Sequence, residues 1–407
     1  MASLNALKSG LCAALCMTAV ACGGGGSVGR GVGGGGGGQT GNVASVIVDE
    51  GPNNASVNTL FTSVTVCVPG TGNCQTIDHV QVDTGSYGLR LLAPILTSAL
   101  NSALPVETLA NGMSIAECTQ FVDGFTWGPI VTADVQVAGE TAKSVPVQVI
   151  GDARYSSVPS DCSGTGTSED TVATFGANGI LGVGPFEIDQ PACADAALAA
   201  CYYACATATS CTSSAVPTAM LVANPVTRFA ADNNGVMIQL PSVPSPAPTV
   251  TGSLIFGIDT QTNNASGTQT VLTVDTNADL LITFNGESLS NSFIDSGSNG
   301  IYFNDTSLAT CTAMNLGEFY CPASTLTLGL SIQGMNGVMA NNLTFDVGNA
   351  QAMLSANPTF NAFPQLAGTN PNPGSFDYGL AFFYGKRVAI AVEDKVTTAG
   401  TGPYIAF

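Results

Sequence analysis

The stretch VQVDTGSYGL at residues 80–89 returns in the second half of the chain as SFIDSGSNGI at residues 292–301. Each copy places an apolar residue before Asp, continues with Thr or Ser, Gly and Ser, and ends on Gly and an apolar residue. A single Asp-[Ser/Thr]-Gly carries little weight, because about 0.3 to 0.5 copies are expected by chance at this composition. Two copies with matched flanks predict two related halves that each contribute one carboxyl, Asp83 and Asp295, to a shared site.

The composition narrows the classes of protein to consider. The 407 residues include 9 Lys+Arg and 28 Asp+Glu, which gives a net charge of −19. This balance argues against a nucleic-acid partner, because phosphate binding needs clustered Lys and Arg. The single histidine, His79, argues against Ser-His-Asp, Cys-His and His-rich metal chemistry. We expect no metal and no organic cofactor.

The distribution of residue types favours a mostly β protein with a sizeable core. Hydrophobic residues make up 45% of the chain, while 48 Gly and 21 Pro favour turns and short strands over long helices. Seven segments rich in β-branched residues and bounded by turn signals predict strands at residues 58–66, 76–82, 130–137, 144–150, 235–240, 253–258 and 388–392. The best helical signal covers residues 192–205.

The N-terminus reads as a targeting segment. Lys8 precedes a short apolar run at residues 11–20, and small residues then lead to Cys22, which is typical of a secretory signal over residues 1–21. The ending resembles the lipobox of bacterial lipoproteins, which implies cleavage before Cys22, lipid on its thiol and, because Gly23 follows, the outer membrane. The alternative is an ordinary secretory signal with an incidental cysteine. With lipid on Cys22, residues 22–42 would form a Gly-rich tether between the membrane and the folded domain.

Ten cysteines remain in residues 43–407 once Cys12, Cys16 and Cys22 are set aside. An even number in an exported chain predicts up to five disulfides. Two pairs close short loops and are the natural candidates: Cys67 with Cys74, and Cys311 with Cys321. The four cysteines between residues 193 and 211 leave a metal site open as an alternative, although an oxidising compartment favours disulfides.

The duplicated motif and its surroundings resemble the pepsin-like aspartic peptidases over roughly residues 58–407. Further segments follow in the order of that family: NGILGVG at residues 178–184, GSLIFGID at 252–259, YGLAFF at 378–383 and the closing strands at 388–407. The resemblance implies an all-β, bilobal fold with two pseudo-twofold-related lobes and a central cleft. The lobes would cover residues 43–260, with a Cys-rich insertion at about 187–216, and residues 261–407.

The resemblance also implies an aspartic endopeptidase at the bacterial cell envelope. Two neighbouring carboxyls cannot both ionise without a large cost, so Asp83 and Asp295 would share one proton and activate water for peptide-bond hydrolysis. The supporting residues would be the remainder of each motif: Thr84, Gly85, Ser86, Ser296, Gly297 and Ser298. The expected partners are a peptide or protein substrate or ligand and, through the N-terminal lipid only, the membrane. We expect a monomer.

Three positions depart from the family pattern. Phe121 stands where the flap usually carries Tyr, Arg90 stands where Trp is common, and Asp377 replaces an apolar residue before the second apolar-Gly segment. Trp127, in the same flap stretch as Phe121, is a candidate to line the cleft, with burial at the base of the flap as the alternative. The missing flap hydroxyl predicts slow turnover. The competing hypothesis is a non-catalytic module that binds a peptide, protein or glycan in the cleft.

Overall fold

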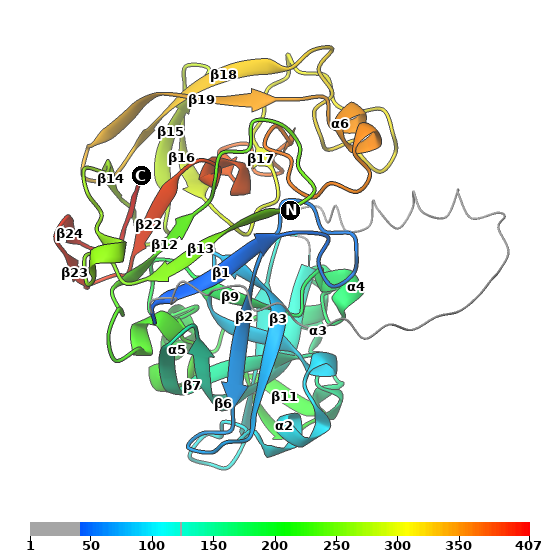
Figure 1. The fold of residues 1–407 in the computed structure, drawn as a ribbon. Helices are drawn as coiled ribbons and strands as arrows, with labels where there is room; N and C mark the ends of the chain where they lie inside the picture. Colours follow the sequence, from blue (N-terminus) through cyan, green and yellow to red (C-terminus); the bar gives the residue numbers. More distant parts are fainter. Residues whose placement is uncertain (1–40, 123) are drawn as a thin grey trace, which may run out of the picture.

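The computed structural model describes residues 41–122 and 124–407. The described chain is mostly β, and its strands build two barrel-like sheets, as Figure 1 shows. The helices of these described residues are short, and the longest α-helix among them has seven residues. The predicted signal segment, Cys22 and most of the Gly-rich tether lie outside the described residues.

The first sheet is a hydrogen-bonded network of sixteen strands. They are β1 Val43–Val48, β2 Leu60–Cys67, β3 Cys74–Asp83, β4 Tyr87–Leu92, β5 Ser114–Gln120, β6 Gly124–Val137, β7 Glu140–Ile150, β8 Thr167–Ser168, β9 Gly179–Val183, β10 Tyr202–Thr207, β11 Ser210–Ser213, β12 Gly235–Gln239, β13 Val250–Phe256, β14 Val271–Thr273, β22 Arg387–Ala391 and β25 Tyr404–Ala406.

The second sheet has seven strands, and a separate pair forms a small ribbon. The seven are β15 Leu280–Phe284, β16 Glu287–Ile294, β17 Ile301–Tyr302, β18 Leu326–Gln333, β19 Met339–Val347, β20 Ala367–Gly368 and β21 Asp377–Tyr378; the ribbon is β23 Val396–Thr397 and β24 Gly400–Thr401. The α-helices are α2 Ser98–Ala103, α3 Ser160–Ser163, α4 Val172–Phe175, α5 Ala192–Asp195 and α6 Ala350–Ala356. Single 3₁₀ turns cover Ala93–Ile95, Ala153–Tyr155, Thr218–Met220, Pro225–Arg228, Thr262–Asn264 and Leu380–Phe383.

The strands predicted from β-branched runs are all present, within a few residues of the expected ends. The helix expected over residues 192–205 is wrong beyond its first turn. α5 ends at Asp195, and the chain enters β10 at Tyr202. The Ala-rich composition favours a helix locally, but β10 pairs with β5 on one side and β11 on the other, and Cys193 is bonded to Cys201. Tertiary contacts therefore override local propensity here.

The end of the chain joins the first sheet after the second sheet is complete. β22 pairs with β12, β25 pairs with β22, and β14 pairs with β25. In Figure 1 β1, β12, β13 and β22 lie between the lobe of β2–β7 and the lobe of β15–β19. A layer drawn from both ends of the chain thus connects the two lobes.

One hydrophobic core runs through both lobes. Its members come from the first sheet, such as Val82 and Leu181, and from the second, such as Ile294 and Phe376. The second lobe is filled by aromatic rings, among which Phe303 stacks on Phe376 with ring centroids 5.3 Å apart. Buried apolar area of this kind is the main source of folding free energy.

All ten cysteines of residues 43–407 form disulfides, which indicates an extracytoplasmic protein. The two predicted pairs, Cys67–Cys74 and Cys311–Cys321, are confirmed. The other bonds are Cys118–Cys162, Cys193–Cys201 and Cys205–Cys211. The four cysteines between residues 193 and 211 are therefore all bonded in disulfides, and their sulfurs do not form a metal site. Within residues 41–122 and 124–407, no group of three or more His, Cys, Asp or Glu is placed to hold a metal ion. No helix of the described chain is long and apolar enough to cross a membrane.

Loop length should set how much each disulfide stabilises the protein. Cys118–Cys162 closes a loop with a sequence separation of 44 and Cys67–Cys74 one of 7. We expect replacement of both cysteines by Ala to lower the free energy of unfolding by about 4 kcal/mol for the long loop and about 2.5 kcal/mol for the short one. Urea denaturation under non-reducing conditions measures both. Met314→Ala, at a fully exposed side chain, is the control and should change stability by less than about 0.5 kcal/mol. The reverse order for the two loops would contradict the entropic explanation.

Candidate active site

The two motifs occupy equivalent places in two equivalent strand arrangements. In the first lobe, β9 lies between β3 and β4, parallel to β3 and antiparallel to β4. In the second lobe, β21 lies between β16 and β17 with the same directions. Asp83 ends β3, and Asp295 directly follows β16. The internal repeat in the sequence therefore corresponds to a repeated topology that presents one Asp from each lobe.

The two motif loops bind each other through reciprocal hydrogen bonds. The Thr84 amide donates to Ser296 Oγ at 3.1 Å, and the Ser296 amide donates to Thr84 Oγ1 at 2.9 Å. Each hydroxyl also donates to a carbonyl of the opposite lobe, Ser296 Oγ to Val82 at 2.9 Å and Thr84 Oγ1 to Ile294 at 3.4 Å. Both residues are buried. These four bonds fix the distance and the orientation between the two loops.

The loops place the carboxyls of Asp83 and Asp295 next to each other: a Cβ at Gly297 would lie 2.4 Å from Asp83 Oδ1 and 3.1 Å from Asp295 Oδ1. The Gly85 amide donates to Asp83 Oδ1 and the Gly297 amide to Asp295 Oδ1, both at 2.7 Å. Each glycine also makes room for the opposite carboxyl. A Cβ at Gly297 would lie 2.4 Å from Asp83 Oδ1, and a Cβ at Gly85 would lie 2.9 Å from Asp295 Oδ1. The approach therefore requires glycine at both positions.

Burial and mutual repulsion keep a proton in this pair. Asp83 is 6% exposed and Asp295 2% exposed. Burial, and then the charge of Asp295, raise the pKa of Asp83 well above its usual range. Burial, and then the charge of Asp377, raise the pKa of Asp295, while Asp83 and the hydrogen bonds from Gly297 and Ser298 oppose that rise. Two coupled carboxyls titrate as a unit, and the donors around Asp295 favour Asp295 as the ionised member.

The serines at the ends of the motifs behave differently in the two lobes. Ser298 Oγ lies 2.8 Å from Asp295 Oδ2 and binds this outer oxygen. Ser86 is the equivalent residue of the first lobe. Its hydroxyl faces Asp83 and lowers the pKa of that carboxyl, although no hydrogen bond of standard geometry joins the two. The site is thus symmetric in its backbone and asymmetric in its outer contacts.

A third carboxyl, Asp377, reaches the site through Ser298. Asp377 lies in β21 and is 5% exposed, and its Oδ2 is 2.6 Å from Ser298 Oγ. Burial raises the pKa of Asp377 to about 7. The sequence marks this residue only as a charged residue in an apolar segment. Its contact with the pair depends on β21 lying beside β16, which the pattern of residues alone does not specify.

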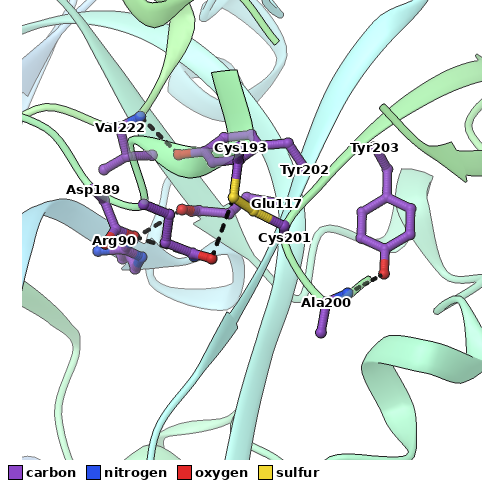
Figure 2. Close-up of a disulfide and its surroundings, with 10 residues drawn as sticks. Arg90, Glu117, Asp189, Cys193, Ala200, Cys201, Tyr202, Tyr203 and Val222 are labelled. Carbon is purple, nitrogen blue, oxygen red and sulfur yellow. Dashed lines mark hydrogen bonds and ion pairs between the residues drawn. A yellow bond between two sulfur atoms is a disulfide. The ribbon is translucent and has the colours of Figure 1, made fainter. Parts of the chain in front are cut away.

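Behind the first loop lies a buried ion cluster centred on Arg90, shown in Figure 2. The Arg90 side chain is completely buried and forms ion pairs with Glu117, at 2.9 Å, and with Asp189. It also donates to the carbonyl oxygen of Tyr87 at 2.8 Å and to Thr119 Oγ1 at 3.0 Å. Burial raises the pKa of Glu117, and the Arg90 guanidinium opposes that rise. Arg90 thus holds the backbone where the Asp83 loop enters β4.

The Cys193–Cys201 disulfide, also drawn in Figure 2, reaches this cluster through Gln190: Cys193 Sγ lies 3.7 Å from Gln190 Oε1, and Gln190 Nε2 donates to Asp189 Oδ2 at 3.5 Å. Cys201 is followed by Tyr202. The Tyr202 hydroxyl accepts a hydrogen bond from the Val222 amide at 2.9 Å and lowers the pKa of Glu117. The Cys-rich segment therefore packs against the support of the first motif loop. Glu117 and Asp189 were not predicted from the sequence as residues that support the site. The available signal was a charged residue, Glu117, between Ala116 and Cys118 in a chain with only 9% charged residues.

The expected flap is a β-hairpin of β5 and β6. At its tip the Phe121 amide donates to Gly124 O at 2.7 Å, and the Phe121 ring packs edge-on against Phe175 with centroids 6.3 Å apart. Trp127, on β6, is 3% exposed; its indole donates to Tyr155 O at 2.8 Å. The structure therefore places Trp127 in the core at the base of the hairpin, which is the second of the two alternatives.

The comparison with known families gives a match over residues 38–407 to a family described as "protein of unknown function (DUF3443)". The chain belongs to this DUF3443 family. No curated protein matches the chain. The family description carries no activity, so the function of this DUF3443 chain has to be argued from the site.

The close approach of the two loops in this DUF3443 member can be tested by filling the space at Gly297. We expect Gly297→Ala to displace Asp83 and to lower the free energy of unfolding by about 1–3 kcal/mol, because the new methyl group overlaps a carboxyl oxygen. Gly72→Ala is the matched control, since nothing lies within 4 Å of a Cβ at that position. Chemical denaturation of both variants gives the comparison. Equal stability of the two would show that the loops do not approach as described.

Proposed function

We propose that the chain is an aspartic endopeptidase-like hydrolase that uses Asp83 and Asp295 as its catalytic pair. The observation that carries the proposal is the contact between these two buried carboxyls, which equivalent loops of two lobes hold together. The repeated strand arrangement around β9 and β21 supports a pepsin-like fold as its framework. The order of the segments at residues 178–184, 252–259 and 378–383, which resembles the order in pepsin-like peptidases, supports the same family.

The chemistry follows from the different surroundings of the two carboxyls. Asp295 accepts hydrogen bonds from Gly297 and Ser298 and is the carboxylate that takes a proton from the attacking water. Asp83 holds the shared proton and donates it toward the oxygen of the scissile carbonyl. The hydroxide adds to the carbonyl carbon. In the collapse of the tetrahedral intermediate, Asp295 gives its proton to the amine as the C–N bond breaks, and a hydroxyl of the intermediate returns a proton to Asp83. The products are a carboxylic acid and an amine, and the pair regains its single proton.

Phe121 sets a limit on the expected rate. Tyr at this place in a flap would offer a hydroxyl to the reacting groups, and Phe offers none. Loss of one hydrogen bond to a transition state costs about 10²–10³ in rate where the bond is well formed. Slow turnover, on a peptide or protein that remains bound for long, is therefore part of the proposal.

We further propose that the protein works at the bacterial cell envelope, anchored by lipid on Cys22, with the outer membrane as its place. The five disulfides support an extracytoplasmic location, and the Ala19–Cys22 sequence supports the anchor. Residues 23–42 would give the folded domain a flexible tether.

Catalysis by the pair predicts a bell-shaped dependence of activity on pH on the acid side, because one member must be ionised and the other neutral. Asp83→Asn and Asp295→Asn should each reduce turnover by about three orders of magnitude or more, and the double variant should be little worse than either. Incubation with a mixed peptide library across acidic pH, followed by mass spectrometry, measures cleavage. Asp195→Asn, at an exposed carboxyl, is the matched control and should leave activity unchanged.

Folding of these variants is checked by the pH dependence of stability. The raised pKa of Asp83 keeps its proton in the folded chain at pH values where the unfolded chain has released it, so wild-type stability falls as pH rises through that window. Asp83→Asn removes this loss and should gain stability relative to wild type as pH rises.

Cleavage that persists in the double variant would rule out the mechanism. Absence of cleavage in wild type at every pH, with ligand binding unchanged in both variants, would favour the binding module instead.

The lipid anchor predicts that wild-type protein is extracted from membranes only with detergent. Each buried CH₂ of an acyl chain contributes about 0.8 kcal/mol, so two or more chains hold a protein firmly. Cys22→Ser should release the protein into the soluble fraction, and the mass of the wild-type N-terminal peptide should show the acyl groups. Equal membrane association of the two forms, with no acyl mass on the wild-type peptide, would overturn the anchor.

A further inference from the structure

The side chain of Ser298 lies between two carboxyls, and this position limits how many protons the site holds. Ser298 Oγ is 2.8 Å from Asp295 Oδ2 and 2.6 Å from Asp377 Oδ2. A hydroxyl has one proton and can donate to only one of the two. The other contact is a hydrogen bond only if a carboxyl supplies the proton. Ser298 is completely buried, so solvent does not relieve the arrangement.

The number of protons held by Asp83, Asp295 and Asp377 follows from the contacts between them. The contacts are Asp83 with Asp295, Asp295 with Ser298, and Ser298 with Asp377. Three contacts need three protons, and Ser298 supplies one of them. The three carboxyls therefore hold two protons and one negative charge when the chain is fully hydrogen-bonded.

The second carboxyl proton belongs on Asp377. Its Oδ1 is buried and has no hydrogen-bond partner among the described residues, so an ionised Asp377 would leave a buried charged oxygen unsatisfied. Asp295, in contrast, accepts from both Gly297 and Ser298. Burial favours the same assignment, because it raises the pKa of Asp377 to about 7. The neutral Asp377 then donates to Ser298, and Ser298 donates to Asp295.

The groups that face Asp377 do not supply a compensating cation. On the β16 side the titratable group is Asp295, reached through Ser298, and Asp83 acts from across the interface between the lobes. On the β17 side the backbone partner is Tyr302, whose hydroxyl donates to Asn299. No Lys, Arg or His forms an ion pair with Asp377 in the part of the chain that the structure describes.

The first lobe shows what the site looks like without this residue. Asp377 pairs with Phe293 in the parallel ladder of the second lobe, and Ile180 pairs with Gln81 at the equivalent place of the first. By strand register, Ile180 of the first lobe is the counterpart of Asp377. The first lobe thus has no acid at the place from which Asp377 reaches Ser298.

We propose that Asp377 is a positioning residue that is neutral in the active protein and, through Ser298, fixes Asp295 as the ionised member of the catalytic pair. This inference rests on the proposed function. Asp377 touches neither water nor substrate in this role; it polarises the Ser298 hydroxyl toward Asp295 Oδ2. When Asp377 ionises, its negative charge acts on the pair and delays the loss of the shared proton.

Infrared spectroscopy of the purified full-length protein locates the proton without any measurement of activity. Wild type should show one more buried neutral carboxyl at mildly acidic pH than Asp377→Asn, and the missing band should titrate near pH 7. Asp195→Asn is the exposed control and should keep all the wild-type bands. Loss of no band in Asp377→Asn would overturn the inference, whether or not the protein cleaves peptides.

Two variants then separate the role of the hydrogen bond from the role of the charge. Asp377→Asn keeps a donor for Ser298 but cannot ionise, so the acid limb of the pH–activity profile should stay in place. An alkaline limb near or above pH 7, where Asp377 ionises, should move toward acid by about one pH unit, because the repelling charge is gone; a limb below that pH should stay in place. Asp377→Ile, the residue type of the first lobe, removes the donor, so Asp295 loses stabilisation as an anion and the acid limb should move to higher pH.

The outcomes distinguish this inference from the proposed function. Unchanged limbs in both variants, with normal cleavage, would overturn the positioning role and leave Asp83 and Asp295 as the catalytic pair. No cleavage in wild type at any pH would overturn the proposed function, while the infrared bands would still decide where the second proton lies. A uniform fall in activity with no movement of either limb would mark Asp377 as merely structural.

Discussion

Two carboxyls that approach across the interface between the lobes are the constraint on which the rest of the structure depends. Buried like charges repel strongly, so Asp83 and Asp295 remain in contact only while they share a proton and while both loops are held in place. The reciprocal bonds of Thr84 and Ser296 hold the loops together. The glycines leave the space that the carboxyls occupy. The strand arrangements behind each loop make this geometry rigid, because each motif lies at the junction of three paired strands.

The support of the first loop extends far from the pair. Arg90 holds the carbonyl of Tyr87 and is itself held by Glu117 and Asp189. A buried ion pair of this kind contributes little net stability, because desolvation of both charges offsets their attraction, but removal of one partner leaves an uncompensated charge. The cluster therefore acts mainly on geometry. The Cys193–Cys201 disulfide lies near this cluster, so the Cys-rich segment also supports the geometry of the first motif loop.

How much of this could be predicted from the sequence depends on whether a feature is local. The duplicated motif, the short disulfide loops Cys67–Cys74 and Cys311–Cys321 and the β-branched strands are patterns of neighbouring residues, and the structure contains them. The helix expected over residues 192–205 failed, because pairing of β10 with β5 joins segments far apart in the chain. Glu117 and Asp377 were invisible as site residues for the same reason. Each acquires its role from a neighbouring strand.

Asp377 shows how an asymmetric site can arise from a symmetric framework. Two identical loops would leave the shared proton equally distributed, and neither carboxyl would be committed to the role of base or acid. Ser298 and Ser86 occupy the same motif position, yet Ser298 binds both Asp295 and Asp377, while the first lobe has Ile180 at the strand position equivalent to Asp377. One buried acid in the second lobe is thus sufficient to break the symmetry. Because the hydrogen bonds run in one direction, from Asp377 through Ser298 to Asp295, they stabilise negative charge on one side of the pair and leave the proton on the other.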